Sequence, residues 1–129
     1  MSSSDQIPPR KHGLAHLFAA ARYSVGGLRR LSRESAFRHE VLAFVVLLAA
    51  YLALGAGGAV ILAFVILFCL LVAVEALNTA IEALVDRVSP EWSEAARDAK
   101  DLGSLAVMCL LVAHGALLVW VVWQALCGS

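Results

Sequence analysis

One short segment in the middle of the chain carries the residues best suited to chemistry. Residues 71–87 read LVAVEALNTAIEALVDR, and their polar members include Glu75, Asn78, Glu82 and Asp86. At about 100° per residue these side chains fall within an arc of about 100°, so they share one face of a helix. Residues 59–74 are apolar and uncharged and lead directly into this segment. Glu75 is therefore expected at the end of a membrane span, where an acid is costly to bury and usually functional.

Two further polar groups are expected at the same membrane boundary. They comprise Glu34, Arg38 and Glu40 before the first apolar run, and Lys100, Asp101 and Ser104 at the start of the last. Clustered carboxylates repel one another unless a cation lies between them, and Mg²⁺ prefers oxygen ligands. A lysine suits phosphate oxygens, and an acid below the headgroups is placed to take a proton from a hydroxyl. The residues alone indicate phosphoryl transfer to a membrane alcohol, with a polar bundle interior or an ion path as alternatives.

Composition indicates what positions these groups. The chain has 129 residues, 61% of them hydrophobic, and every Asp, Glu, Lys and Arg lies within residues 5–40 or 75–101. The mean hydropathy of +0.83 is that of a small integral membrane protein. We predict an all-α membrane protein with transmembrane helices over about 36–55, 59–86 and 102–127.

The first part of the chain predicts a tail and a surface helix. Residues 1–12 combine Ser, Pro and charge and are expected to be disordered, leaving 13–129 as the membrane domain. Over 13–33 apolar residues recur at helical spacing, with arginines on the other side, which predicts an amphipathic helix in the headgroup plane or, alternatively, a soluble helix that docks on a partner. Gly26–Gly27 is expected to break or bend it.

The connections set the orientation of the spans. GAGGA at 55–59 predicts a tight turn, and 87–101 predicts a polar loop, with Pro90 ending the preceding helix and Trp92 as an interfacial anchor. Three spans place the N-terminus and this loop on one side, with all ten basic residues. By the positive-inside rule that side is the cytoplasm. His114, within the last span, is expected to make a helix-contact hydrogen bond rather than to act in catalysis.

Several of these motifs together resemble one known family. EALNTAIEALVDR is followed, thirteen residues after Arg87, by Lys100 in AKDLGS, and is preceded by RYS and ESAFRHE. This combination closely resembles the prokaryotic diacylglycerol kinase family from about residue 13 to 126. The resemblance implies a three-span membrane enzyme of the bacterial cytoplasmic membrane with an N-terminal surface helix. It also implies a homotrimeric bundle with sites shared between neighbouring chains, and phosphorylation of a lipid alcohol by ATP with Mg²⁺.

The resemblance also implies a role for each matched residue. Glu75 matches the general base, and Glu34 and Glu82 match the carboxylates that hold the metal on the nucleotide. Asn78, together with Glu75, matches the surroundings of the lipid substrate and transferred phosphate, and Ser104 a lipid contact. The further nucleotide contacts are Tyr23, Glu91, Trp92, Ser93, Lys100 and Asp101.

The chain departs from the family pattern in its first helix. His16 stands where arginine is expected, Arg33 stands where asparagine commonly precedes the glutamate, and the segment between Tyr23 and Glu34 is one residue short. These changes concern lipid-side and surface-helix contacts rather than the catalytic set. The family includes undecaprenol kinases, but the loop DRVSPEWSEAARDAKDLGSLAV is more similar to the diacylglycerol branch. The expected product is phosphatidic acid, feeding phospholipid recycling; the alternatives are an undecaprenol kinase or a non-enzymatic membrane subunit.

Overall fold

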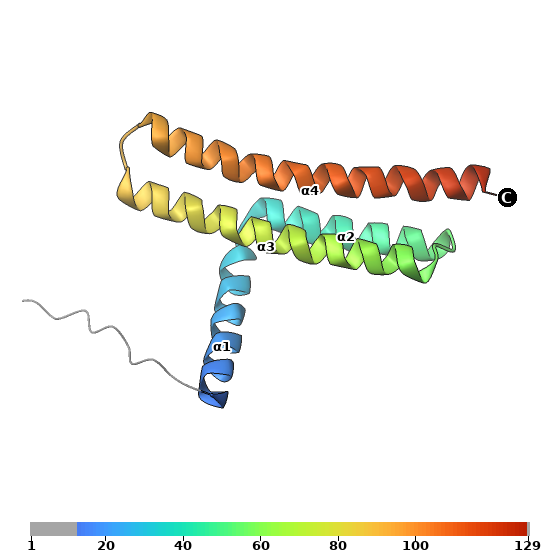
Figure 1. Cartoon of the computed structure of the whole chain (residues 1–129), viewed down its shortest axis with the longest axis horizontal. Coiled ribbons are helices and arrows are strands. Elements are labelled where there is room, and N and C mark those ends of the chain that lie inside the picture. Colours follow the sequence, from blue (N-terminus) through green and yellow to red (C-terminus); the bar gives the residue numbers. More distant parts are fainter. Residues whose placement is uncertain (1–12, 129) are drawn as a thin grey trace, which may run out of the picture.

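The computed structural model describes residues 13–128 as four helices. They are α1 (Leu14–Leu31), α2 (Ser35–Ala53), α3 (Gly58–Val88) and α4 (Glu94–Cys127) (Figure 1). Helices α2, α3 and α4 lie side by side, and each is long and apolar enough to cross a membrane. The predicted all-helical fold with three candidate spans is confirmed. The tail predicted over 1–12 lies outside the described residues.

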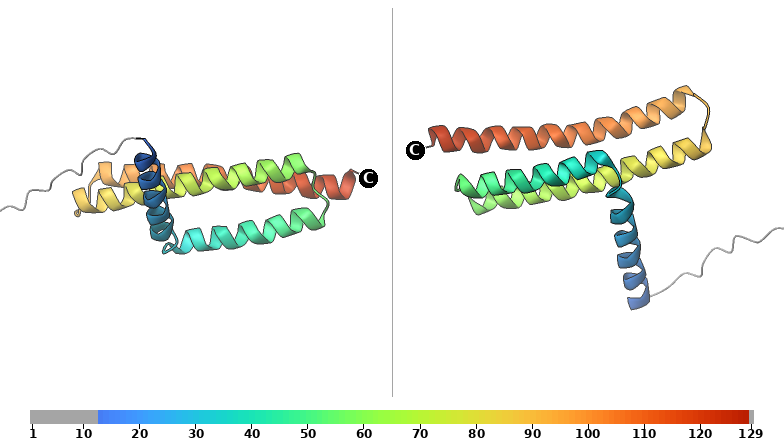
Figure 2. Two further views of the ribbon diagram at one scale, coloured as in Figure 1. Left: turned by 90° about the horizontal axis from the view of Figure 1, so that it is seen from below. Right: turned by 180° about the vertical axis from the view of Figure 1, so that it is seen from behind.

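Helix α1 projects away from the bundle in Figure 1 and in the view from behind (Figure 2, right). The sequence predicted a break or a bend at Gly26–Gly27, and the break is wrong, because α1 continues through both residues without interruption. Glycine lowers helix stability by entropy and not by a steric clash, so neighbouring residues can carry the helix through it. The apolar side chains Leu17, Phe18 and Leu28 of α1 are exposed in the single chain.

Helices α2 and α3 are joined by a short glycine-containing turn, as predicted. Gly55 adopts a positive φ of 71° just after α2, a conformation that L side chains rarely adopt. The backbone N–H of Ala56 donates to the Tyr51 carbonyl at 2.9 Å, and that of Gly55 donates to the Leu52 carbonyl at 3.1 Å. These two bonds form a Schellman motif, which satisfies carbonyls at the end of α2 and reverses the chain.

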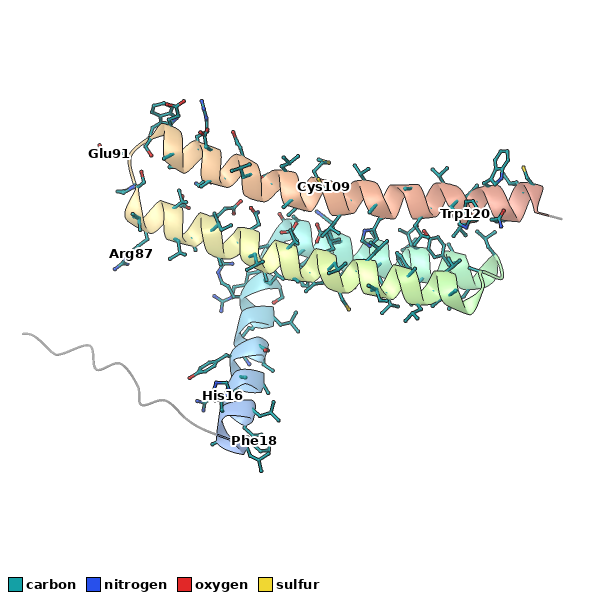
Figure 3. The ribbon with its side chains drawn as sticks, viewed as in Figure 1. His16, Phe18, Arg87, Glu91, Cys109 and Trp120 are labelled. Atoms are coloured by element: carbon teal, nitrogen blue, oxygen red, sulfur yellow. The ribbon has the colours of Figure 1, made fainter. Side chains whose placement is uncertain are left out.

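The connection between α3 and α4 is shorter than predicted. Helix α3 ends at Val88, before Pro90 as expected, but α4 begins at Glu94 and not near residue 102. The Ser93 hydroxyl accepts a hydrogen bond from the Ala96 backbone N–H at 3.2 Å, which caps α4. Residues 94–101 therefore form two charged helical turns that continue the last span. Both Arg87 and Glu91 lie at this end of the bundle (Figure 3).

Helices α3 and α4 extend beyond the start of α2 (Figure 1). The 31 residues of α3 make about 46 Å of helix, against a hydrocarbon core of about 30 Å. The buried aromatic core lies at the other end, where Tyr51, Phe64 and Val121 pack together near the α2–α3 turn. Phe44 stacks on Phe64 with ring centroids 5.0 Å apart. This packing leaves the charged turns of α3 and α4 at the end away from the aromatic core.

Candidate active site

Glu75 is buried within the single chain. Its side chain is 7% exposed, and it is the one charged residue among those described that is buried. It lies on α3, where the apolar part of that helix gives way to the polar segment. Glu75 is therefore covered by other parts of the chain rather than left on its outer surface. A carboxylate at this depth is placed to meet the hydroxyl of a lipid.

A second acid, Glu40 of α2, faces Glu75. The two carboxyl groups lie close enough to interact directly, and Glu40 is half-buried. The sequence placed Glu40 at the same membrane boundary but did not include it among the site residues. The available signal was its position six residues after Glu34, at the entry to α2. Which side of α2 faces α3 depends on the rotation of α2 about its own axis, and the sequence alone does not fix that rotation.

Asn78 connects α3 to α4 and orients Glu82. The Asn78 side-chain amide donates to a Glu82 carboxylate oxygen at 3.1 Å, one turn along α3. On its other side Asn78 lies against Gly103 of α4, where a Cβ atom would come within 2.1 Å of the Asn78 carbonyl oxygen. Gly103 is therefore a further residue of the site that sequence reasoning missed. Only a glycine at this position lets the side chain of Asn78 lie so close to α4.

Lys100 of α4 contacts α3 at Asp86, further along the same face. Its ammonium group donates to an Asp86 carboxylate oxygen at 2.6 Å. Lys100 precedes the apolar part of α4. Its hydrogen bond to the Asp86 carboxylate raises the pKa of Lys100. A cation is therefore held at the cytoplasm-side end predicted for the bundle, near enough to the polar face of α3 to meet a phosphate bound there.

A pocket of about 300 Å³ lies between α3, α4 and their connection. Of the eight predicted nucleotide contacts, it is lined by four, Glu91, Trp92, Ser93 and Lys100. Both Glu91 and Trp92 are exposed, whereas Ser93 is occupied in capping α4. The structure therefore brings half of the predicted nucleotide contacts to one open pocket, next to the Asp86–Lys100 pair.

The remaining predicted residues are not gathered in the single chain. Tyr23 is exposed on α1, and Asp101 and Ser104 are exposed on α4. Glu34 precedes α2 and pairs with Arg30, and Glu82 is half-buried on α3. Within residues 13–128, no group of three Asp, Glu, His or Cys side chains converges on one point. The two carboxylates of Glu34 and Glu82 are nevertheless suitable ligands for Mg²⁺, which takes its further ligands from phosphates and water.

Comparison with known proteins identifies the family. The profile of the family described as prokaryotic diacylglycerol kinase matches residues 22–123. A diacylglycerol kinase from a Sinorhizobium species is 53% identical over 113 residues, covering 88% of this chain and 82% of the relative. The diacylglycerol kinase of Escherichia coli K12 is 38% identical over 111 residues, covering 84% of this chain and 88% of the relative. The Pseudomonas aeruginosa enzyme of that name is 43% identical over 97 residues, covering 73% and 77%. The chain belongs to the prokaryotic diacylglycerol kinase family.

Proposed function

We propose that this chain transfers the γ-phosphoryl group of ATP to the free hydroxyl of diacylglycerol at the cytoplasmic face of the bacterial inner membrane. As a member of its family the chain is a kinase and a membrane enzyme with candidate spans in α2, α3 and α4. This membership favours an enzyme over the non-enzymatic membrane subunit. The product is phosphatidic acid, which returns to phospholipid synthesis.

The observation that carries this proposal is the graded polarity along one face of α3. Glu75 is buried at the apolar end, Asn78 and Glu82 follow on the same face, and Asp86 binds Lys100 at the polar end. A lipid hydroxyl approaches from the membrane, and a nucleotide from the aqueous side. Their reacting groups therefore meet along this face, between Glu75 and Lys100.

Each group has a separate role in the transfer. Glu75 takes the hydroxyl proton as the lipid oxygen bonds to the γ-phosphorus and the bond to the ADP oxygen breaks. Asn78 orients Glu82 and meets the transferred phosphate, while Lys100 neutralises phosphate charge. The pocket formed by Glu91, Trp92 and Ser93 receives the nucleotide, with Asp101 and Tyr23 as outer contacts. Ser104 contacts the lipid.

Magnesium would be held by Glu34 and Glu82. Both are carboxylates, and neither is deeply buried, so each keeps an oxygen without a protein partner that a hydrated ion can reach. When bound with the nucleotide, the ion supplies positive charge to the phosphate oxygens. To reach it, the Glu34 carboxylate must leave its ion pair with Arg30.

We propose a homotrimer as the active unit. One chain alone leaves large apolar side chains exposed on all three spans, for example Leu42, Leu62 and Trp120. In the single chain Glu34 pairs with Arg30, and Tyr23 is exposed on α1. A site completed by α1 and the start of α2 from a neighbouring chain would bring these residues together with Glu75. In this arrangement the N-terminus is on the cytoplasmic side of the membrane.

Diacylglycerol is preferred to undecaprenol because the family profile and the relatives above carry that substrate in their names. The test is an assay of purified protein in detergent micelles with labelled ATP and Mg²⁺. We expect phosphorylation of a short-chain diacylglycerol, with undecaprenol a poor substrate. Faster phosphorylation of undecaprenol would move the chain to the polyprenol branch. Failure to phosphorylate either lipid would contradict the proposed function.

A further inference from the structure

A partly open cavity beside Glu40 lies between α2, α3 and α4. Its volume is about 110 Å³, and its walls are almost entirely apolar, with Phe64 and Leu111 among them. Two polar side chains interrupt this lining, Glu40 from α2 and His114 from α4. Because the rest of the wall offers no polar group, these two side chains determine what the cavity holds.

The histidine presents a hydrogen-bond acceptor there. His114 Nδ1 lies 2.8 Å from the Leu110 carbonyl oxygen. A carbonyl only accepts, so Nδ1 carries a proton, and the neutral tautomer with that proton has a bare lone pair on Nε2. The Nε2 atom is buried and has no hydrogen-bond partner among the described residues. Phe64 contacts the ring edge-on with centroids 5.8 Å apart, which fixes its orientation.

Glu40 presents the complementary group. Its Oε2 atom is also buried without a hydrogen-bond partner among the described residues, while its carboxyl group interacts with that of Glu75. Two carboxyl groups in contact can share a proton, and the group that carries it becomes a donor. If Glu40 carries the proton, it can donate toward His114, and Glu75 stays ionised.

We propose that His114 is a positioning residue for the phosphoryl transfer, linked to Glu40 by a water molecule in this cavity. The Glu40 hydroxyl donates to the water, and the water donates to His114 Nε2. A water needs about 10–15 Å³ and at least two polar partners; the cavity has the room, and Glu40 and His114 are the polar residues that line it. This hydrogen-bond chain favours the proton on Glu40, and Glu75 is left free to accept the proton of the lipid hydroxyl. The inference rests on the proposed role of Glu75.

The set of titratable groups that could produce this effect is small. Among the described residues, Glu40 from α2 and His114 from α4 are the titratable side chains that line the cavity. Glu75 from α3 joins them through its interaction with Glu40. His39, adjacent to Glu40 in sequence, is exposed and does not line it. His39 is therefore a matched control for the loss of an imidazole.

The first measurement is the pH dependence of kcat at saturating MgATP and diacylglycerol. In His114→Phe, which keeps a ring but has no acceptor, the proton redistributes toward Glu75. We expect the acid limb of the profile to move to higher pH by about half to one unit, the scale of one hydrogen bond. His114→Gln keeps an acceptor oxygen and should move the limb less. His39→Phe should leave the limb in place. A lower rate with an unchanged acid limb in His114→Phe would show a merely structural role and overturn the inference.

The second measurement is independent of activity. In protein labelled with ¹⁵N-histidine, the His114 Nε2 resonance is assigned by its disappearance in His114→Gln. We expect Glu40→Met, which has no hydrogen-bond donor, to shift this resonance and leave that of His39 unchanged. An unshifted His114 resonance would overturn the inference even if the kinase is active. If the wild-type protein phosphorylates no lipid but the His114 resonance shifts in the Glu40 variant, the proposed function is contradicted and the Glu40–His114 link stands.

Discussion

Gly103 of α4 lies directly against the side chain of Asn78 on α3. A Cβ atom at position 103 would be 2.1 Å from the Asn78 carbonyl oxygen and 3.2 Å from its Cγ. The same Asn78 side chain donates to Glu82 at 3.1 Å. The absence of a side chain on α4 therefore allows the hydrogen bond that orients a proposed metal ligand on α3.

Gly103→Ala should displace Asn78 and so lose the hydrogen bond to Glu82. We expect the Asn78 side chain to rotate away, because its end can move more easily than the two helix backbones. A lost hydrogen bond to a charged group corresponds to a fall of about tenfold or more in kcat/KM. Gly115→Ala is the matched control, since a Cβ there meets nothing within 4 Å. Equal losses in both variants would show a general sensitivity of α4 to substitution.

Lys100→Met tests the phosphate-binding role of the cation at the start of α4. Methionine keeps the length of the side chain but removes the ammonium group, so we expect the KM for ATP to rise about tenfold or more. Steady-state kinetics at varied ATP measures this change. Arg87→Met removes a positive charge at the same end of the bundle, from a residue that does not line the nucleotide pocket. A comparable rise in that variant would indicate long-range charge rather than contact.

Glu34→Ala and Glu82→Ala should each raise the Mg²⁺ concentration that gives half-maximal activity, since a carboxylate ligand is lost in each. The measurement is a Mg²⁺ titration at fixed ATP. Glu94→Ala, at an exposed position in the first turn of α4, should leave the Mg²⁺ requirement unchanged. An unaltered requirement in both site variants would place the metal elsewhere.

Mixed oligomers test whether a site draws residues from two chains. Glu75→Gln and Glu34→Ala proteins are denatured together and reassembled, and we expect part of the wild-type activity to return. The control is Glu75→Gln mixed with Glu82→Ala. Those residues lie two turns apart on one face of α3 and belong to one site, so activity should not return. No recovery in the first mixture, with mixed trimers verified by crosslinking, would mean that each chain builds its own site.

The sequence predicts the spans well because they depend on a strong one-dimensional signal. Residues 41–74 and 102–129 carry no charged side chain, and α2, α3 and α4 follow from those runs. The start of α4 at Glu94 was not predicted, because residues 94–101 are mostly charged or polar and this composition is typical of a loop. Ser93 followed by Glu94 is, however, a helix-start pattern, and Ser93 caps α4.

The candidate site was only partly predictable for a different reason. The shared face of Glu75, Asn78 and Glu82 follows from helical periodicity within one helix. The Glu40–Glu75 contact and the Gly103–Asn78 contact depend on how separate helices rotate and approach one another. Neither relationship leaves a periodic signal in the sequence, so both required the three-dimensional structure.

The most direct test of the catalytic account is the turnover of Glu75→Gln. Glutamine keeps the size and hydrogen bonding of the side chain but cannot accept the hydroxyl proton. We expect the variant to bind nucleotide normally while its kcat falls by about 10²- to 10⁴-fold, whereas Glu94→Gln, exposed on α4, retains wild-type turnover. A kcat near the wild-type value in Glu75→Gln would contradict the assignment of Glu75 as the base.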